Sequence, residues 1–367
     1  MKAIIKLMAA CLTALPFAPS AKADYDFRSD DCRYCFVEGG VEAVGTAGSG
    51  YEPWKTFELP QTVRFRGTYY TVVGIGHNAF AGMAGSYMWA GHSIKLPERL
   101  EYIADGGLKN GVINGTGLPE GMKRIGESAF EGTLFKEKWI DLIFISKDVT
   151  EIGQKAFYLF GCGQQYGLQS NEIESLIFED RDLPMEITDQ QFTSIPAYKI
   201  TIGEGITKIG NRAFYWEAIP TMTEMISFPS TLQSIGEKAF ALRAGETAYC
   251  HAMVPPSTAA PSSYDIGEDC TLYVPEGTRE AYADHPFWSR FARIVDNLPS
   301  SLPVISGADG IGDIRVENGR IIADGHVEVY NMQGALLASG IAADLPVLSP
   351  GLYIVRGASK TVKVAVR

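Results

Sequence analysis

The chain has 367 residues, and its 43 acidic and 32 basic residues give a formal net charge of −11 at neutral pH. An acidic surface repels nucleic acid and anionic lipid, so we expect neither as a partner. The sequence shows no cluster of Lys and Arg with interleaved aromatic residues that would counter this expectation, and no segment long and apolar enough to cross a membrane.

Residues 1–23 have the pattern of a secretory signal peptide. Lys2 and Lys6 precede an apolar run through Phe17, and Ala21-Lys22-Ala23 forms a small-x-small cleavage site. Cys11 would also allow a lipoprotein box, but it lies early in the apolar run, so cleavage after Ala23 is favoured. Removal of the segment leaves 29 basic residues and a formal charge of −14. We therefore expect an exported protein, at the cell surface, in the outer membrane or secreted.

A short phrase repeats along the middle of the chain. Its copies start 22 to 35 residues apart, an interval typical of supersecondary units that stack into a solenoid. The recurring Gly indicates either unusual backbone torsion angles or a close backbone approach, and the recurring Phe residues should stack as a buried spine. The copies are Ile75–Phe80, Ile125–Phe130, Ile152–Phe157, Ile209–Phe214 and Ile235–Phe240, with weaker copies at Ile103–Leu108 and Ile187–Phe192.

A short strand should precede each phrase. Apolar residues recur nine and seven positions before the Ile, the period-2 spacing of a strand with one face inward. The residues between them should point outward on one common face, together with a residue from Leu176-Ile177-Phe178. These outward residues are Lys95, Phe144, Ile177, Thr201 and Ser227.

The repeats resemble the BspA-type leucine-rich repeat of bacterial cell-surface proteins. Residues 24–71 resemble that family's opening β cap, and residues 271–295 its closing cap. The resemblance implies a mainly β fold, a right-handed leucine-rich repeat solenoid with short parallel strands over residues 72–296. It also implies adhesion to extracellular-matrix proteins and co-aggregation as typical roles.

A Pro- and Ser-rich linker at 297–306 separates the repeats from a tail at 307–367. Alternating apolar residues and Gly turns in the tail predict a small antiparallel β-sandwich. The tail resembles the C-terminal sorting (Por-type) domain of type IX secretion in Bacteroidetes. The matching residues are 329–334, 348–356 and 363–367. The resemblance implies recognition by the secretion machinery; a retained accessory domain is the alternative.

The sequence contains no recognisable catalytic constellation. Its five His form no metal-protease or zinc pattern, and Cys32-Arg-Tyr-Cys35 lacks the βαβ context of a redox site, so a local disulfide or plain packing is favoured. We expect no enzyme, no cofactor and no bound metal. Cys250 and Cys270 are about one repeat apart and would either form a disulfide between adjacent coils or be two small buried residues.

Two surfaces are candidates for binding. The first is the outward strand face from Lys95 to Ser227, whose Phe144 and Ile177 could form an apolar patch, pack under inserts, or be single exposed residues. The second comprises the aromatic residues Trp89 and Trp216, where inserts emerge after the repeats. We therefore expect a non-catalytic protein that binds a protein or glycan ligand at the cell surface. The alternative is a glycan-binding or envelope-assembly accessory module, which exposure of the two Trp residues would favour.

Overall fold

The computed structural model shows that the chain divides into two compact units, Met1–Leu298 (unit 1) and Pro299–Arg367 (unit 2). The predicted signal peptide at residues 1–23 lies outside the residues that the structure describes. These are residues 25–29, 31–47, 56–82, 93–163, 170–216, 223–258, 266–298, 315–317, 320–323, 326–330, 336–342, 345–348, 351–356 and 361–366.

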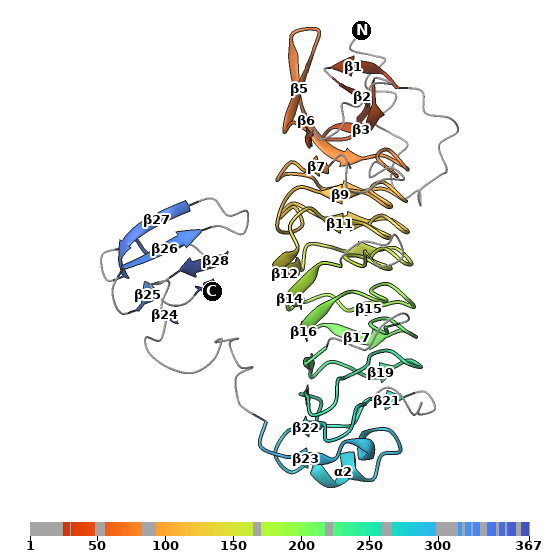
Figure 1. Cartoon of the computed structure of the whole chain (residues 1–367), viewed down its shortest axis with the longest axis vertical. Coiled ribbons are helices and arrows are strands. Elements are labelled where there is room, and N and C mark those ends of the chain that lie inside the picture. The colour runs from red at the N-terminus through yellow and green to blue at the C-terminus, as the bar shows by residue number, and fades with distance from the viewer. Residues whose placement is uncertain are drawn as a thin grey trace. The chain divides into compact units, whose positions relative to one another are not determined.

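Unit 1 opens with a small antiparallel cap. Strand β1 (Phe27–Ser29) pairs with β2 (Cys32–Val37), which pairs with β3 (Gly40–Thr46). The hairpin of β5 (Thr62–Phe65) and β6 (Thr68–Ile75) completes the cap, and β6 pairs with β3 in parallel. The far end of β6 contains Ile75, the first residue of the repeated phrase, so one strand joins the cap to the solenoid (Figure 1).

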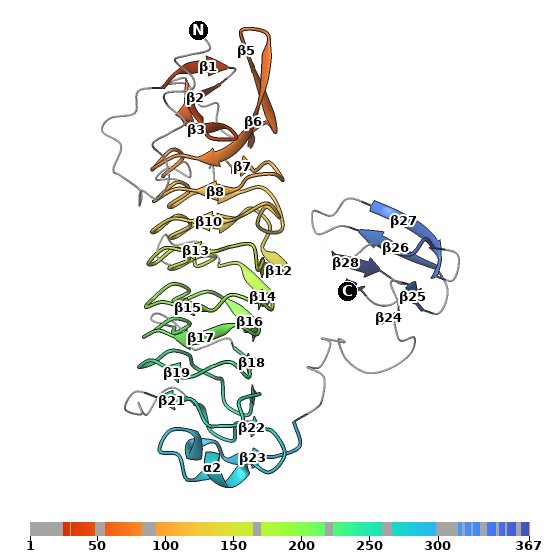
Figure 2. The same ribbon diagram turned by 180° about the vertical axis from the view of Figure 1, so that it is seen from behind.

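Each rung of the solenoid contributes two short strands, where the sequence predicted one. The second strand contains the Ile of the repeated phrase and stacks in parallel with its equivalents, as Figure 2 shows for β8, β10 and β13 below β6. Two-residue strands are too short to produce a period in the sequence. This column comprises β8 (Tyr102–Ile103), β10 (Arg124–Ile125) and β13 (Glu151–Ile152), then a separate sheet of β15 (Met185–Ile187), β17 (Ile206–Ile209), β19 (Ser234–Ile235) and β21 (Ser257–Thr258).

The strands predicted at residues 94–96, 143–145, 200–202 and 226–228 lie in the other column, which also forms two sheets. The first has the order β11-β9-β7-β4, and the second has seven parallel strands from β12 to β23. The short helix α2 (Arg279–Ala283) and the 3-10 turn η3 (Trp288–Arg290) lie just before β23. The strands are β4 (Thr56–Glu58), β7 (Ser93–Lys95), β9 (Val112–Ile113) and β11 (Leu134–Phe135), then β12 (Trp139–Ile145), β14 (Glu172–Phe178), β16 (Ala197–Thr201), β18 (Met225–Phe228), β20 (Thr247–Cys250), β22 (Thr271–Tyr273) and β23 (Arg293–Val295).

The Phe residues of the repeated phrase form the predicted buried spine. Phe130 stacks on Phe157 with ring centroids 5.0 Å apart, and Phe157 stacks on Phe192 at 4.8 Å. Phe192 in turn stacks on Phe214 at 5.4 Å, and all four rings are at most 1% exposed. These separations match the spacing of about 4.8 Å between parallel strands, so ring and backbone stack at the same interval.

The recurring Gly is explained by close approach of the preceding rung. A Cβ on Gly153 would lie 2.3 Å from the amide nitrogen of Glu127, and one on Gly210 would lie 2.6 Å from that of Asp189. None of these glycines has a positive φ. The left-handed residue lies two positions later, for example Lys155 with φ of 55°.

Unit 2 consists of two antiparallel sheets. One pairs β24 (Arg315–Glu317) with β25 (Arg320–Ile322), and the other has the order β27-β26-β28-β29. Ile321 of the first sheet shares a buried cluster with Val327, Val329 and Val355 of the second, so both sheets face one small core. The larger sheet comprises β26 (His326–Tyr330), β27 (Leu336–Ile341), β28 (Gly351–Arg356) and β29 (Thr361–Val366). The predicted fold class, a solenoid of stacked parallel strands followed by a small antiparallel unit, is confirmed.

We predict that Gly153→Ala destabilises unit 1 by about 1–3 kcal/mol, because the added methyl group would overlap backbone atoms that cannot move away. Gly115→Ala is the matched control, since its Cβ would meet only Ile113 Cγ2, at 3.8 Å. All five Trp residues precede residue 299, so Trp fluorescence during urea unfolding reports on unit 1. Equal midpoints for the two variants would contradict the close-approach explanation.

Candidate binding surface

The structure brings four of the predicted outward residues side by side on the seven-stranded sheet. Phe144 of β12 pairs with Ile177 of β14, Ile177 with Thr201 of β16, and Thr201 with Ser227 of β18. The same register continues to Tyr249 of β20 and Tyr273 of β22. We call these six residues the outer row.

The exposure of the outer row differs along its length. Phe144, Ile177 and Thr201 are half-buried, but Ser227 is only 1% exposed. The prediction that Ser227 offers a contact surface is therefore wrong. Its short side chain lies between the larger side chains of Thr201 and Tyr249 on the neighbouring strands, which leave little of it accessible to solvent.

Lys95 does not lie beside these residues, contrary to the prediction. It belongs to β7, in the separate sheet β11-β9-β7-β4. The rung between Lys95 and Phe144 forms its strand at Val112–Ile113. It has no strand near Gly117, the position equivalent to Lys95 and Phe144, so no single ladder joins these two residues. Lys95 Nζ donates to Glu58 Oε1 at 2.8 Å, and this hydrogen bond and the charge of Glu58 raise the pKa of Lys95.

Of the two tryptophans predicted to be at inserts, Trp89 lies outside the described residues. Trp216 is only 5% exposed and belongs to the interior, so its prediction as a contact residue is wrong. It lies two residues after Phe214 of the spine, where the chain still packs against the core. Its burial counts against an aromatic glycan platform at this position.

The stacked pair Tyr249 and Tyr273 was not predicted. Their ring centroids are 5.2 Å apart with an interplanar angle of 15°, and burial raises the pKa of Tyr249. The signal was present in the sequence. Thr247-Ala-Tyr-Cys250 and Thr271-Leu-Tyr-Val274 place a Tyr after an inward apolar residue, but both segments follow the last complete phrase, and the second was assigned to the closing cap.

A second aromatic pair lies at the start of the same sheet. Trp139 of β12 stacks on Tyr198 of β16 at 6.0 Å, and Trp139 is 47% exposed. Trp139 Nε1 donates to Asp141 Oδ1 at 3.0 Å, and the Tyr198 hydroxyl donates to Glu172 Oε2 at 3.4 Å. The alternation of inward and outward side chains along β12 shifts by one residue at Leu142, so Trp139 and Phe144 both point outward although they are five positions apart. A strict period-2 pattern therefore does not predict the Trp139–Tyr198 pair.

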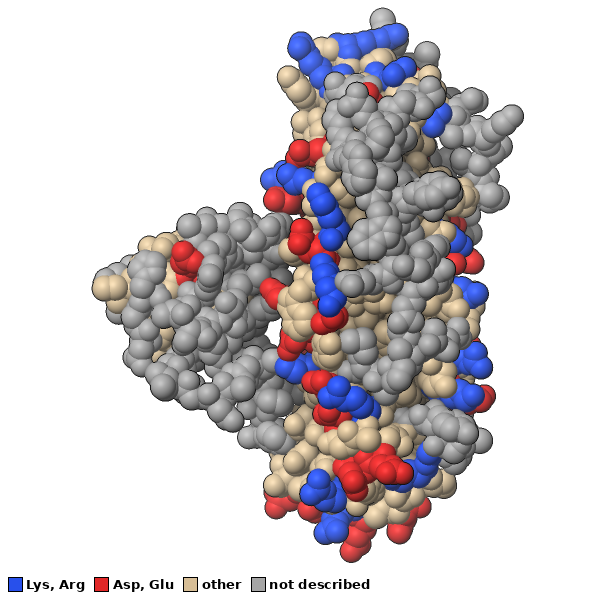
Figure 3. Space-filling model, in the orientation of Figure 1, with Lys and Arg blue, Asp and Glu red and all other residues tan. Residues whose placement is uncertain are grey.

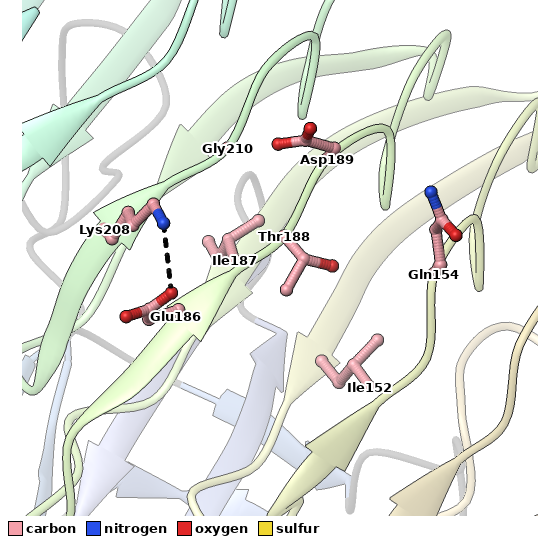
Figure 4. A pocket seen from close by; sticks show the side chains of 8 residues that line it. All are labelled: Ile152, Gln154, Glu186, Ile187, Thr188, Asp189, Lys208 and Gly210. Carbon is pink, nitrogen blue, oxygen red and sulfur yellow. Dashed lines mark ion pairs between the residues drawn. The ribbon is translucent and has the colours of Figure 1, made fainter.

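An open cleft of about 430 Å³ lies between β13 and β15, where the column of strands that contain the Ile of the repeated phrase is interrupted (Figure 4). Strands β13 and β15 do not pair, and the fully buried Gln191 bridges them. Its Nε2 donates to the Ile152 carbonyl oxygen, and its Oε1 accepts from the Thr188 amide at 3.0 Å. The lining residues are Ile152, Gln154, Glu186, Ile187, Thr188, Asp189, Lys208 and Gly210.

The polar groups of this cleft are engaged with one another. Lys208 Nζ lies 3.4 Å from Glu186 Oε2, and Asp189 Oδ1 accepts from the Asn211 amide at 2.7 Å. Neither carboxylate is arranged with a nucleophile or a general base. Among the described residues, no group of three His, Cys, Asp or Glu side chains could hold a metal ion. The cleft thus follows from the break in the column between β13 and β15.

The predicted disulfide between Cys250 and Cys270 is contradicted. Thr247 pairs with Thr271 and Tyr249 with Tyr273, so Cys250 is aligned with Val274, four residues beyond Cys270. Four residues correspond to about 13 Å along a strand, beyond the reach of a disulfide. Cys250 instead contacts the Tyr282 hydroxyl at 3.1 Å, while Cys270 donates to the Arg243 carbonyl oxygen at 3.2 Å. Both cysteines are buried, in agreement with the alternative prediction of two small buried residues.

Cys32 and Cys35 also do not form the local disulfide considered above. They are three residues apart on β2, which places their side chains on opposite faces of the strand. Cys32 faces the core, contacts the Gly45 carbonyl oxygen at 3.3 Å, and has a pKa raised to about 11 by burial. It therefore lacks the thiolate character of a redox site.

Comparison with known proteins shows what the repeats are. Residues 64–183 and 185–247 match the family described as BspA type leucine rich repeat region, in six copies. The solenoid is a BspA-type leucine-rich repeat region. The match covers the rungs from β6 to β19, including the weaker copies at Ile103 and Ile187. No curated protein matches the chain.

Two solved structures are similar to the chain. A leucine-rich repeat protein from Bacteroides ovatus is 19% identical, with 74% of this chain and 88% of that chain covered and a TM-score of 0.28. The pneumococcal vaccine antigen PcpA is 13% identical, with 74% and 98% covered and a TM-score of 0.25. In the described part of the chain, no helix is long and apolar enough to cross a membrane.

We predict that Gln191→Leu destabilises the BspA-type region. The substitution removes the acceptor of the Thr188 amide, and it leaves the buried Ile152 carbonyl oxygen without its donor, at a cost of about 1–3 kcal/mol for that buried group. Gln233→Leu, at an exposed position, is the control. Urea unfolding measures the stability, and hydrogen exchange should accelerate at Thr188. An unchanged exchange rate would show that Gln191 does not hold the two sheets together.

Proposed function

We propose that this protein is a non-catalytic, exported binding protein that mediates adhesion to host or microbial macromolecules at the cell surface. The BspA-type repeats support this proposal, because proteins of this type are typically at the surface or secreted. The signal pattern of residues 1–23 points in the same direction. The charged groups of the cleft already interact with other groups of the protein, so the cleft offers no support for a catalytic function.

The outer row is the observation that carries the proposal. Phe144, Ile177, Tyr249 and Tyr273 give one face of the seven-stranded sheet a line of half-exposed apolar and aromatic side chains. Aromatic residues are enriched at the energetic centres of protein interfaces. Stacked strands hold these side chains in place before binding, so little conformational freedom is lost on association.

The double variant Tyr249→Ser/Tyr273→Ser should reduce binding to an immobilised panel of collagen, laminin and fibronectin by at least roughly 10-fold, about 1.4 kcal/mol. Tyr158→Ser/Tyr215→Ser is the matched control, because those two tyrosines lie under Lys155 and Lys238 away from the outer row. Biolayer interferometry with the full chain measures the affinity. An equal loss in both variants would remove the outer row as the binding face.

A glycan-binding or envelope-assembly module is the second candidate. The exposed Trp139, stacked on Tyr198 and flanked by Asp141, favours it, because an open aromatic face beside polar groups suits a sugar ring. The buried Trp216 counts against it. A glycan array beside the matrix-protein panel separates the candidates: binding to glycans alone would support this second function.

We further propose that unit 2 is a sorting domain read by the type IX secretion machinery. The resemblance of residues 329–334 and 348–356 supports this, and the two small antiparallel sheets are compatible with it. Intact-mass analysis of material released from native cells by protease shaving should find a species that starts at Asp24 and ends near Gly307. A species that retains Arg367 and is protected from protease would contradict both sorting and surface display.

A further inference from the structure

Strand β12 begins the seven-stranded sheet with one of its edges unpaired. Among the described strands, only β14 pairs with it (Figure 1). The preceding rung instead passes this edge as residues 114–117, which include two glycines. This segment starts beside Lys136, whose amide donates to the Ile113 carbonyl oxygen at 2.8 Å, and a Cβ on Gly117 would lie 3.6 Å from the Leu142 carbonyl oxygen. Residues 114–117 therefore lie alongside the first half of β12 and have little side chain to cover it.

The missing strand leaves the indole of Trp139 largely open to solvent. The ring leans across β14 toward Tyr198 of β16, with an interplanar angle of 30°, so the Tyr covers only the side toward the sheet. Trp139 remains 47% exposed, whereas the two other described tryptophans, Trp216 and Trp288, are 5% and 0% exposed. The indole of Trp139 thus adds nothing to the core, and its open surface is available to a ligand.

Hydrogen bonds hold both rings of the pair in place. Trp139 Nε1 donates to Asp141 Oδ1 at 3.0 Å, two residues along the same strand. The Tyr198 hydroxyl donates to Glu172 Oε2, and the other oxygen of Glu172 lies 2.5 Å from Lys138 Nζ. Because these contacts orient the rings before a ligand arrives, binding costs little conformational entropy.

The charges around the two rings disfavour an anionic ligand. Lys138 pairs with Glu172, and Lys199 pairs with Glu174 at 2.6 Å, so both nearby cations are neutralised. Among the described residues, Asp141 forms no ion pair, which leaves one carboxylate uncompensated. The space-filling view shows the same mixture of basic and acidic side chains along this side of the solenoid (Figure 3). A sulfate or uronate group would be repelled here, whereas a neutral hydroxyl group can donate to a carboxylate.

We propose that Trp139 is the platform for a neutral sugar ring of a glucan. A pyranose with equatorial hydroxyl groups has C–H groups on both faces, which pack on an aromatic ring, while its hydroxyl groups point outward from the ring edge. Those hydroxyl groups can donate to the Asp141 carboxylate and exchange hydrogen bonds with Thr116, an exposed residue of the neighbouring segment. The inference rests on the second proposed function, glycan binding, and names the class of glycan and the residues that hold it.

The test is isothermal titration calorimetry of the full chain with two probes, cellohexaose as a neutral glucan and hexagalacturonate as its acidic counterpart. We expect cellohexaose to bind more tightly than hexagalacturonate. Trp139→Ala should weaken cellohexaose binding by at least roughly 10-fold, because the stacking surface is lost. Trp139→Phe, which keeps a smaller ring, should lose less. Asp141→Ala should also weaken binding, because it removes both a hydroxyl acceptor and the partner of the indole N–H.

Tyr69→Ala is the matched control, because it removes another exposed aromatic ring of unit 1, 68% exposed on β6 of the cap. It should leave the affinity within about twofold, as expected for a distant site. A glycan array run in parallel separates the possible failures. Binding to no glycan would overturn this inference together with the second proposed function. Glycan binding that Trp139→Ala leaves intact would overturn the site alone, and tighter binding of hexagalacturonate would overturn the neutral class.

Discussion

The structure of unit 1 depends on the close approach of backbone between successive rungs. At Gly126, Gly153, Gly210 and Gly236, the backbone of the preceding rung occupies the space of a side chain. This contact sets a rung interval close to that of a parallel β-ladder, and the Phe rings four residues further on stack at the same interval. Because each rung buries its apolar side only against its neighbours, the core exists only when the rungs are stacked.

Where this contact is missing, side chains take over the role of the backbone. The phrase at Ile187 has Thr188 in place of Gly, and β15 does not pair with β13. Gln191 and Arg181 bridge the interruption by donating to the carbonyl oxygens of Ile152 and Val149. The Phe spine nevertheless continues across it, since Phe157 stacks on Phe192. The solenoid thus tolerates a local opening of the ladder while its core remains continuous.

Stacking also determines which surface groups remain available to a partner. Residues at equivalent positions of adjacent rungs lie side by side, so Lys and Glu neutralise each other along the rod, as Lys208 and Glu186 do. The outer row, by contrast, consists of uncharged side chains, among them the stacked pair Tyr249 and Tyr273.

The repeat, its register and its core could be predicted from the amino-acid sequence. The period of the Ile, Gly and Phe positions is a local property, so the Phe spine and the adjacency of Phe144, Ile177, Thr201 and Ser227 could be predicted from spacing alone. The sequence allowed two explanations for the recurring Gly, unusual backbone torsion angles or a close backbone approach. The position of the preceding rung shows that close approach is the reason.

The tertiary structure decided every property that depends on neighbours remote in the chain. Ser227 and Trp216 are buried because of what surrounds them, and Lys95 lies in another sheet because the intervening rung lacks the aligned strand. Cys250 and Cys270 are about one repeat apart in sequence but four residues out of register, since the rung between β20 and β22 is longer than the spacing of the two cysteines. The cap is likewise assembled from remote parts of the chain, because Phe27 of β1 stacks on Phe65 of β5. Spacing along the chain encodes periodic contacts, whereas exposure arises from packing between elements.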